Sequence, residues 1–260
     1  MSETEFNVVR SVGFVLAVAI AAGLQRWRPH ARMRRPWRSN VGLWAINLVV
    51  IGVVCGGCAC AVARWAAAAD VGLLNAISAP TWLGVPVTVL VLDFVSYLWH
   101  RANHRVRWLW RFHQVHHSDA AFTVSTGVRF HPGELLLSLP VRLAAVTALG
   151  PSPLAVVAFE VVFTIANLVE HGNIDLPLAI ERRIGRVWIT PALHRRHHSR
   201  RRSELNSNFG TLFAWWDRLL GTYAGSSSDE RIETGLADLP ETPRIGRALI
   251  LPLRFYAPRA

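Results

Sequence analysis

Long apolar runs alternate with polar segments from the start of the chain to about residue 170. A helix needs roughly 20 mainly apolar residues to cross the hydrocarbon core of a bilayer. Five runs approach that length, and they cover residues 12–24, 41–63, 82–99, 135–149 and 153–169. We therefore expect an all-α, integral-membrane helical bundle of four to five membrane helices.

The last two runs are separated by Gly150-Pro151-Ser152-Pro153, a turn signal that predicts a helical hairpin. From Ser226 onward, Ser, Asp, Glu and Pro are mixed, which predicts a loosely ordered tail. We expect three parts: N-terminal membrane helices with a basic loop at 1–80, a catalytic domain at 81–225 and a C-terminal tail at 226–260.

The chain has a formal net charge of +11, and all 28 of its basic residues are arginines. Such a balance fits either nucleic acid or an anionic membrane surface. Six arginines lie in one loop between the first two apolar runs, which favours the membrane over nucleic acid: Arg26, Arg28, Arg32, Arg34, Arg35 and Arg38. The positive-inside rule places this loop in the cytoplasm, and exclusive use of arginine favours a bacterial inner membrane.

This topology carries the histidines to one side. If the arginine loop is cytoplasmic, run 41–63 leads outward and run 82–99 returns inward, where it delivers His100. The hairpin goes out and comes back, so His171 also emerges inside. We therefore expect a cytoplasmic helical cap that carries the histidines.

Eight histidines form three compact motifs. His100 and His104 are an i, i+4 pair that a helix places about 6 Å apart on one face. Two HxxHH motifs follow: His113, His116 and His117, then His194, His197 and His198. In each, we expect the first two histidines to share a face and the third to reach an adjacent direction, so that one helix serves two metal ions.

A metal site explains these clusters better than packing does. Buried neutral imidazoles would each need a hydrogen-bond partner. Zinc sites usually close at four ligands, so eight imidazoles indicate two metal ions. Imidazole suits iron, zinc, copper and nickel alike, and ligand type favours iron only slightly.

The motifs resemble those of the fatty acid hydroxylase superfamily, also called the sterol desaturase family. The similarity runs from Asp93 to Tyr223 and includes these further elements: Tyr97 and Arg101, Trp108 or Trp110, Ser118, Arg129-x-His131-Pro132-x-Glu134, Thr190-Pro191, Asn208-Phe209-Gly210, Trp216-Asp217-Arg218 and Gly221-Thr222-Tyr223. The resemblance implies a membrane-embedded di-iron oxygenase that uses dioxygen to hydroxylate or desaturate a lipid-like substrate such as a sterol or fatty acyl chain.

Four more residues are candidates for the site. His171 follows the fifth run, and we interpret it as a ninth metal ligand beside the eight in the motifs. Asn167, one turn earlier, is an additional or water-mediated contact. His131 is either a ligand or a residue that orients one. Asp93 lies two turns before His100, and we expect it to accept a histidine N–H.

Oxygen chemistry needs electrons, and the sequence contains no nucleotide-binding glycine motif, haem attachment site or ferredoxin cysteine run. A separate reductase or electron carrier is therefore implied. Arginines around the third motif are positioned either for an acidic carrier or for anionic lipid headgroups: Arg195, Arg196, Arg200, Arg201 and Arg202.

Two other functions remain open. The first is a membrane metal-binding or transport protein, although transport sites lie near the bilayer midplane and these motifs lie beyond helix ends. The second is a zinc-dependent membrane hydrolase with Glu170 or Glu134 as general base. The substrate itself, whether sterol, fatty acyl, alkyl ether, carotenoid or sphingoid, is not specified by the motifs.

Overall fold

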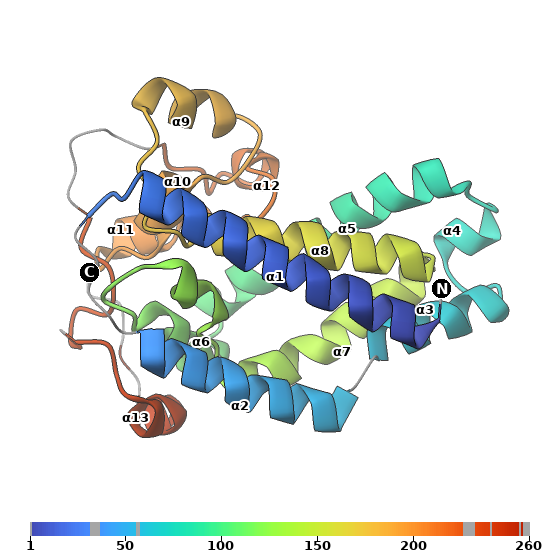
Figure 1. Cartoon of the computed structure of the whole chain (residues 1–260), viewed down its shortest axis with the longest axis horizontal. Coiled ribbons are helices and arrows are strands. Elements are labelled where there is room, and N and C mark those ends of the chain that lie inside the picture. The colour runs from blue at the N-terminus through green and yellow to red at the C-terminus, as the bar shows by residue number, and fades with distance from the viewer. Residues whose placement is uncertain are drawn as a thin grey trace.

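The computed structural model describes residues 2–31, 37–55, 58–225, 232–239, 241–254 and 256. The helices of the apolar runs make up the bundle (Figure 1): α1 (Glu3–Trp27), α2 (Trp37–Cys55), α3 (Cys58–Ala68), α5 (Thr81–Arg105), α7 (Pro132–Leu149) and α8 (Pro153–Glu170). Shorter elements join or cap them: α4 (Leu73–Ala76), α6 (Arg107–His117), η1 (Val124–Val128), α9 (Leu178–Ile184), α10 (Pro191–His197), α11 (Arg202–Leu205), α12 (Trp215–Leu219), α13 (Ile245–Ile250) and η2 (Leu251–Leu253). The all-α expectation is confirmed for the described residues, which contain isolated bridges but no strand.

Five helical segments are long and apolar enough to cross a membrane, which confirms the expected number of spans. Large apolar side chains of α1 such as Val12, Val15 and Leu16 are exposed, as a lipid-facing surface requires. The opposite face of α1 packs on α8 through small residues. A Cβ added at Gly13 would lie 2.7 Å from a methyl of Val161, so the two backbones approach closely there.

The expected second run, 41–63, lies on α2 and α3. Helix α2 ends at Cys55 and α3 begins at Cys58, while residues 56 and 57 lie outside the described part of the chain. The predicted hairpin is present between α7 and α8. Gly150 adopts a left-handed φ of 65°, and the Ser152 hydroxyl accepts from the Ala155 N–H at the start of α8.

One end of the bundle carries the cap (Figure 1). The C-terminal ends of α1, α5 and α8 meet there with α6, α10, α11 and α12. The loop after α1 is bound to the loop after α8, because the His30 N–H donates to the Asn173 carbonyl (3.1 Å) and the Asp175 N–H donates to the Arg28 carbonyl (2.8 Å). Arg26 and Arg28 therefore lie at the same end as His171, while Arg32, Arg34 and Arg35 fall outside the described residues.

The expectation of a loosely ordered tail is wrong for its described residues. Leu236, Leu239, Ala248 and Leu251 are buried in a cluster with residues of α2 and α6. The Gln114 amide donates to the carbonyls of Leu251 (3.1 Å) and Arg254 (2.7 Å). Apolar residues spaced among the polar ones hold this segment against the cap. The average composition of the segment, on which the expectation was based, does not reveal this spacing.

Arg129 joins the layers of the cap. Its side chain is fully buried, and its guanidinium donates to Val115 O, Ser118 Oγ and Asn40 Oδ1. Burial lowers the pKa of Arg129, and the nearby Asp119 carboxylate partly offsets this effect. The arginine therefore ties α2, α6 and η1 into one support beneath the histidines.

Candidate metal centre

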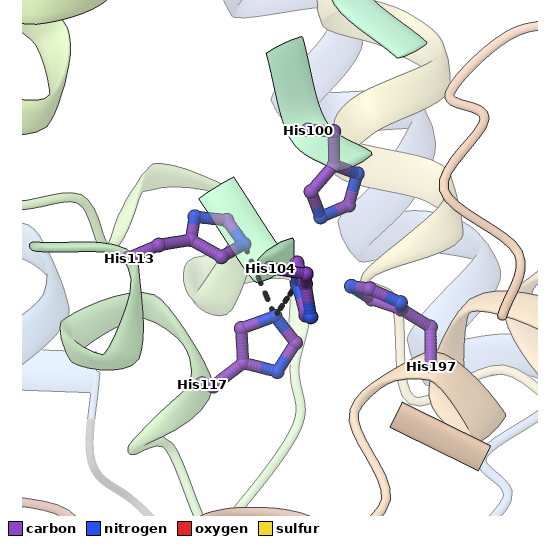
Figure 2. Close-up of side chains that lie close together, drawn as sticks. All are labelled: His100, His104, His113, His117 and His197. Carbon is purple, nitrogen blue, oxygen red and sulfur yellow. Dashed lines mark hydrogen bonds between the residues drawn. The ribbon is translucent and has the colours of Figure 1, made fainter. Parts of the chain in front are cut away.

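All nine histidines expected to bind metal converge at the cap, and they divide into two groups. His100, His104, His113, His117 and His197 form a group of five, and His116, His171, His194 and His198 form a group of four. Within each group, one nitrogen from every ring lies within 4.8 Å of all the others, an arrangement that could hold a metal ion. Figure 2 shows the group of five, whose rings come from α5, α6 and α10.

The division corrects the expected geometry of the HxxHH motifs. His113 and His117 share a group, while His116 between them belongs to the other group. Likewise His194 and His198 share a group and His197 does not. Residues at i and i+4 are separated by about 40° around a helix of 3.6 residues per turn, whereas i and i+3 are about 60° apart. The first and third histidines of each motif are therefore aligned, and the middle one points to the other group.

Nitrogen spacing within the groups resembles that of ligands around one ion. His104 Nε2 and His117 Nε2 lie 3.1 Å apart, and His194 Nε2 and His171 Nε2 lie 2.9 Å apart. Imidazole nitrogens bind metals at roughly 2.1 Å, so two ligands at right angles are about 3.0 Å apart and two tetrahedral ligands about 3.4 Å apart. The observed pairs are closer to the right-angled arrangement.

Five rings are held in place through their outer nitrogen. Each Nδ1–H donates to an oxygen, which fixes the tautomer and turns Nε2 toward the group. The pairs are His100 with Phe209 O (2.8 Å), His113 with Glu134 Oε1 (2.8 Å), His116 with Arg129 O (3.2 Å), His171 with Asn167 O (2.6 Å) and His197 with Ser207 O (2.7 Å).

Several buried ring nitrogens have no hydrogen-bond partner among the described residues. They include His100 Nε2, His197 Nε2 and both nitrogens of His198. An unsatisfied buried polar atom costs roughly 1–3 kcal/mol. A cation between the rings would satisfy several of these nitrogens at once, so the residues present fit a metal.

Burial also keeps these rings in the neutral form that binds metal. Removal from water lowers the pKa of His171 to about 4 and, together with the neighbouring His113, lowers the pKa of His197 to about 3. For the same two reasons, burial and adjacent imidazoles, four further rings have a pKa well below the ordinary value: His116, His117, His194 and His198.

Asp93 does not accept a histidine N–H as expected. Its carboxylate accepts from the backbone N–H groups of Leu212 (3.1 Å) and Phe213 (3.3 Å) and from Trp216 Nε1 (2.8 Å). Seven residues of helix separate it from His100, a rise of roughly 10 Å, which is too far for contact. Asp93 instead holds the segment whose Phe209 carbonyl orients His100.

His131 and Asn167 also have structural partners. His131 caps α7, because its Nδ1 accepts from the Gly133 N–H (2.9 Å) and its Nε2 donates to Leu249 O (3.1 Å). Both of its nitrogens are engaged. The Asn167 side-chain amide donates to Gly127 O (2.8 Å), and its backbone oxygen orients His171.

Sequence reasoning missed most of the oxygens that orient the rings. Glu134 was visible as part of the His131-Pro132-x-Glu134 element, but the carbonyls of Phe209 and Ser207 have no sequence signal. Asp217 was also missed as a support. It accepts from the N–H groups of Phe209 (2.8 Å) and Gly210 (2.9 Å) and from the Thr222 hydroxyl (2.7 Å).

A cavity of about 180 Å³ lies between α5, α7 and α8 and reaches the histidines. Its lining includes five of the histidines, His100, His113, His116, His171 and His194, together with apolar side chains such as Leu92, Val95, Leu135, Val141, Phe159 and Phe163. A mainly apolar cavity that opens onto the histidine rings suits a hydrocarbon substrate.

Comparison with known proteins matches the same part of the chain. Residues 85–222 match the sequence profile described as Fatty acid hydroxylase. The chain is 32% identical to the ornithine lipid hydroxylase OlsE of Rhizobium tropici over 60% of this chain and 46% of that protein. It is 30% identical to human cholesterol 25-hydroxylase over 55% and 52% of the two chains, and 29% identical to human alkylglycerol monooxygenase over 56% and 32%. The chain thus spans about half the length, or less, of these relatives. No solved structure matches.

Proposed function

The chain belongs to the fatty acid hydroxylase family, and from this premise we propose that it is an integral-membrane enzyme that uses dioxygen to hydroxylate a lipid at two histidine-held iron ions. The observation that carries the proposal is the convergence of nine imidazoles in two groups beside an apolar cavity. The named relatives act on an ornithine lipid, on cholesterol and on alkylglycerols, so a lipid substrate is the common feature.

Iron is favoured over zinc by the donor set. Five nitrogens in one group exceed the four ligands at which zinc sites usually close, and the spacing of the paired nitrogens is closer to right angles than to a tetrahedron. We assign one ion to each group. When bound, iron supplies the oxidising power for C–H cleavage that no side chain has, by reducing dioxygen with two external electrons.

The chain's own residues position the substrate and exclude water. Val95, Phe159 and Phe163 line the cavity and would hold a hydrocarbon chain with its reacting carbon near His100 and His116. Because five of the rings are locked by Nδ1–H bonds, these rings hold their Nε2 atoms toward the metal without rearrangement. We propose residues 81–225 as the catalytic domain, with the basic loop and the histidines on the cytoplasmic side of a bacterial inner membrane.

Electrons must come from a separate reductase or carrier. The arginines that were expected to dock a partner differ in their exposure in the structure. Arg195 is buried and donates to Ile174 O (2.7 Å), so the expectation that it docks a partner is wrong. Arg201 and Arg202 are exposed at the cap. We propose that they contact an acidic carrier or anionic headgroups.

The test uses the full-length protein purified in detergent and loaded with iron. We expect about two iron ions per chain and hydroxylated products that require dioxygen and a chemical reductant, with a panel of ornithine lipid, cholesterol and alkylglycerol as substrates. The variants H104A and H198A, one from each group, should each lose one ion and the activity. Full turnover without iron, or without dioxygen, would refute the proposal and favour a hydrolase.

A further inference from the structure

Glu170 is a buried carboxylate beside the group of four. It is the last residue of α8, its residue exposure is 1%, and it lines the cavity with His171 and His194. Its Oε1 lies 3.7 Å from His171 Nδ1 and 3.8 Å from His194 Nε2. Its Oε2 has no hydrogen-bond partner among the described residues.

Such a carboxylate needs a compensating partner. Burying an ionised carboxylate costs several kcal/mol unless a cation or hydrogen-bond donors stabilise it. The groups within salt-bridge distance of Glu170 are the imidazoles of His171 and His194, and the His171 Nδ1–H is already donated to the Asn167 carbonyl. A metal ion in the group of four would supply the missing positive charge.

We propose that Glu170 is an oxygen ligand to the ion held by His116, His171, His194 and His198, an inference that rests on the proposed two-metal function. With bonds of roughly 2.1 Å, ligands on one ion are about 3.0 Å apart at right angles and about 4.2 Å apart when opposite. The 3.8 Å between Glu170 Oε1 and His194 Nε2 lies in this range. Glu170 is not part of the set of four whose ligand atoms lie within 4.8 Å of one another, so its side chain must turn toward the ion to become the fifth ligand, an anion facing the substrate cavity.

The test compares E170Q and E170D with wild type in the iron-loaded, full-length protein. A matched control is E181Q, because Glu181 is also a buried glutamate, at 4% exposure, but lies in α9 and belongs to neither histidine group. Iron per chain is measured after graded exposure to a chelator, and Mössbauer spectra distinguish the two iron environments. We expect E170Q to lose one ion at a chelator concentration at least tenfold lower, while E170D and E181Q retain both.

Retention of both ions by E170Q at wild-type chelator resistance would overturn this ligand assignment. So would equal loss in E170Q and E170D, because that result would indicate packing rather than the carboxylate. If the wild-type protein itself holds fewer than two ions, the two-metal proposal fails instead. The two failures are therefore distinguishable.

A second, independent observation concerns Arg142, a charged residue inside an apolar membrane helix. It lies in the middle of α7, is partly buried and lines the cavity. Within the described part of the chain no acidic side chain pairs with it, whereas Glu160 of the adjoining helix α8 pairs with Arg10 at 3.0 Å. An arginine in a membrane span is costly and is retained where it serves a function.

Arg142 lies eight residues along α7 from Glu134, a distance of roughly 12 Å. The cavity therefore has metal-binding rings at one end and a guanidinium farther along. We infer that the substrate, under the proposed function, carries an anionic oxygen group, carboxylate or phosphate, that pairs with Arg142 while its hydrocarbon chain reaches the histidines. A guanidinium binds either anion through paired N–H donors.

Binding rather than turnover tests this inference, so its outcome does not depend on oxygen chemistry. Oleate, oleyl alcohol and lysophosphatidate are titrated against wild type, R142Q and R142K under nitrogen, with displacement of a fluorescent lipid as the readout. We expect at least one of the two anions to bind wild type about tenfold more tightly than the alcohol, R142Q to abolish this preference and R142K to keep most of it. The anion affected identifies a carboxylate or a phosphate source. Equal binding of both anions by wild type and R142Q would overturn the inference.

Discussion

Replacing Glu134 tests how much of the metal affinity comes from the residues that orient the rings. Glu134 is 5% exposed, and its Oε1 accepts from His113 Nδ1 (2.8 Å) and Asn103 Nδ2 (3.3 Å). E134Q keeps the size of the side chain and one carbonyl acceptor but removes the charge that makes the His113 ring a stronger ligand. E134A removes the acceptor as well.

The expected magnitude follows from this geometry. Loss of such a partner typically lowers metal affinity 10- to 100-fold, which corresponds to roughly 1.4–2.7 kcal/mol. Because glutamine still accepts the Nδ1–H, we expect about a tenfold loss for E134Q and about a hundredfold loss for E134A. The effect should be confined to the ion of the group of five, since His113 belongs to that group.

The assay is chelator competition on the iron-loaded protein, followed by measurement of iron per chain, with E181Q as the control for a buried glutamate. The monodisperse elution of each variant from size-exclusion chromatography checks its fold. If E134Q retains both ions at wild-type affinity, or if both ions are lost together, the argument that Glu134 supports one ion through His113 is refuted.

Three further predictions concern residues around the centre. H131A should lower the melting temperature by removing the cap of α7, a loss of about 1 kcal/mol, while iron content stays at the wild-type level; loss of iron would instead identify His131 as a ligand. D93N should destabilise the protein by roughly 2–4 kcal/mol, because three N–H donors lose a charged acceptor, and a thermal unfolding curve that matches wild type would contradict this. The metal-free protein should lose stability as pH falls from about 6.5 toward 4, because the unfolded chain then binds protons that buried rings such as His171, with a pKa of about 4, do not. The free energy of unfolding should fall by up to about 1.4 kcal/mol per pH unit for each such ring. Melting temperatures at pH 8 and pH 5, with and without iron, measure this loss. An identical melting temperature of the metal-free protein at both pH values would show that the rings are not buried in the neutral form.

The sequence by itself determined the helical class, the four to five spans and the fact that the histidines gather at one end of the bundle. These features follow from local rules, because an apolar run of about 20 residues forms a membrane helix whatever its neighbours. A span that ends at His100 and a hairpin that ends near His171 must deliver both to the same end. Helical spacing also placed the histidines within each motif near one another before any packing was known.

Only the tertiary structure decided how nine rings divide between two groups and what orients each ring. The sequence expectation grouped the first two histidines of each HxxHH motif, whereas the folded helices align the first and the third. Asp93, His131 and the C-terminal segment were also interpreted wrongly or left open by the sequence, because their partners lie more than 100 residues away along the chain. Hydrogen bonds to backbone carbonyls such as those of Phe209 and Ser207 depend on the path of the chain rather than on side-chain identity, so a sequence pattern carries no signal for them.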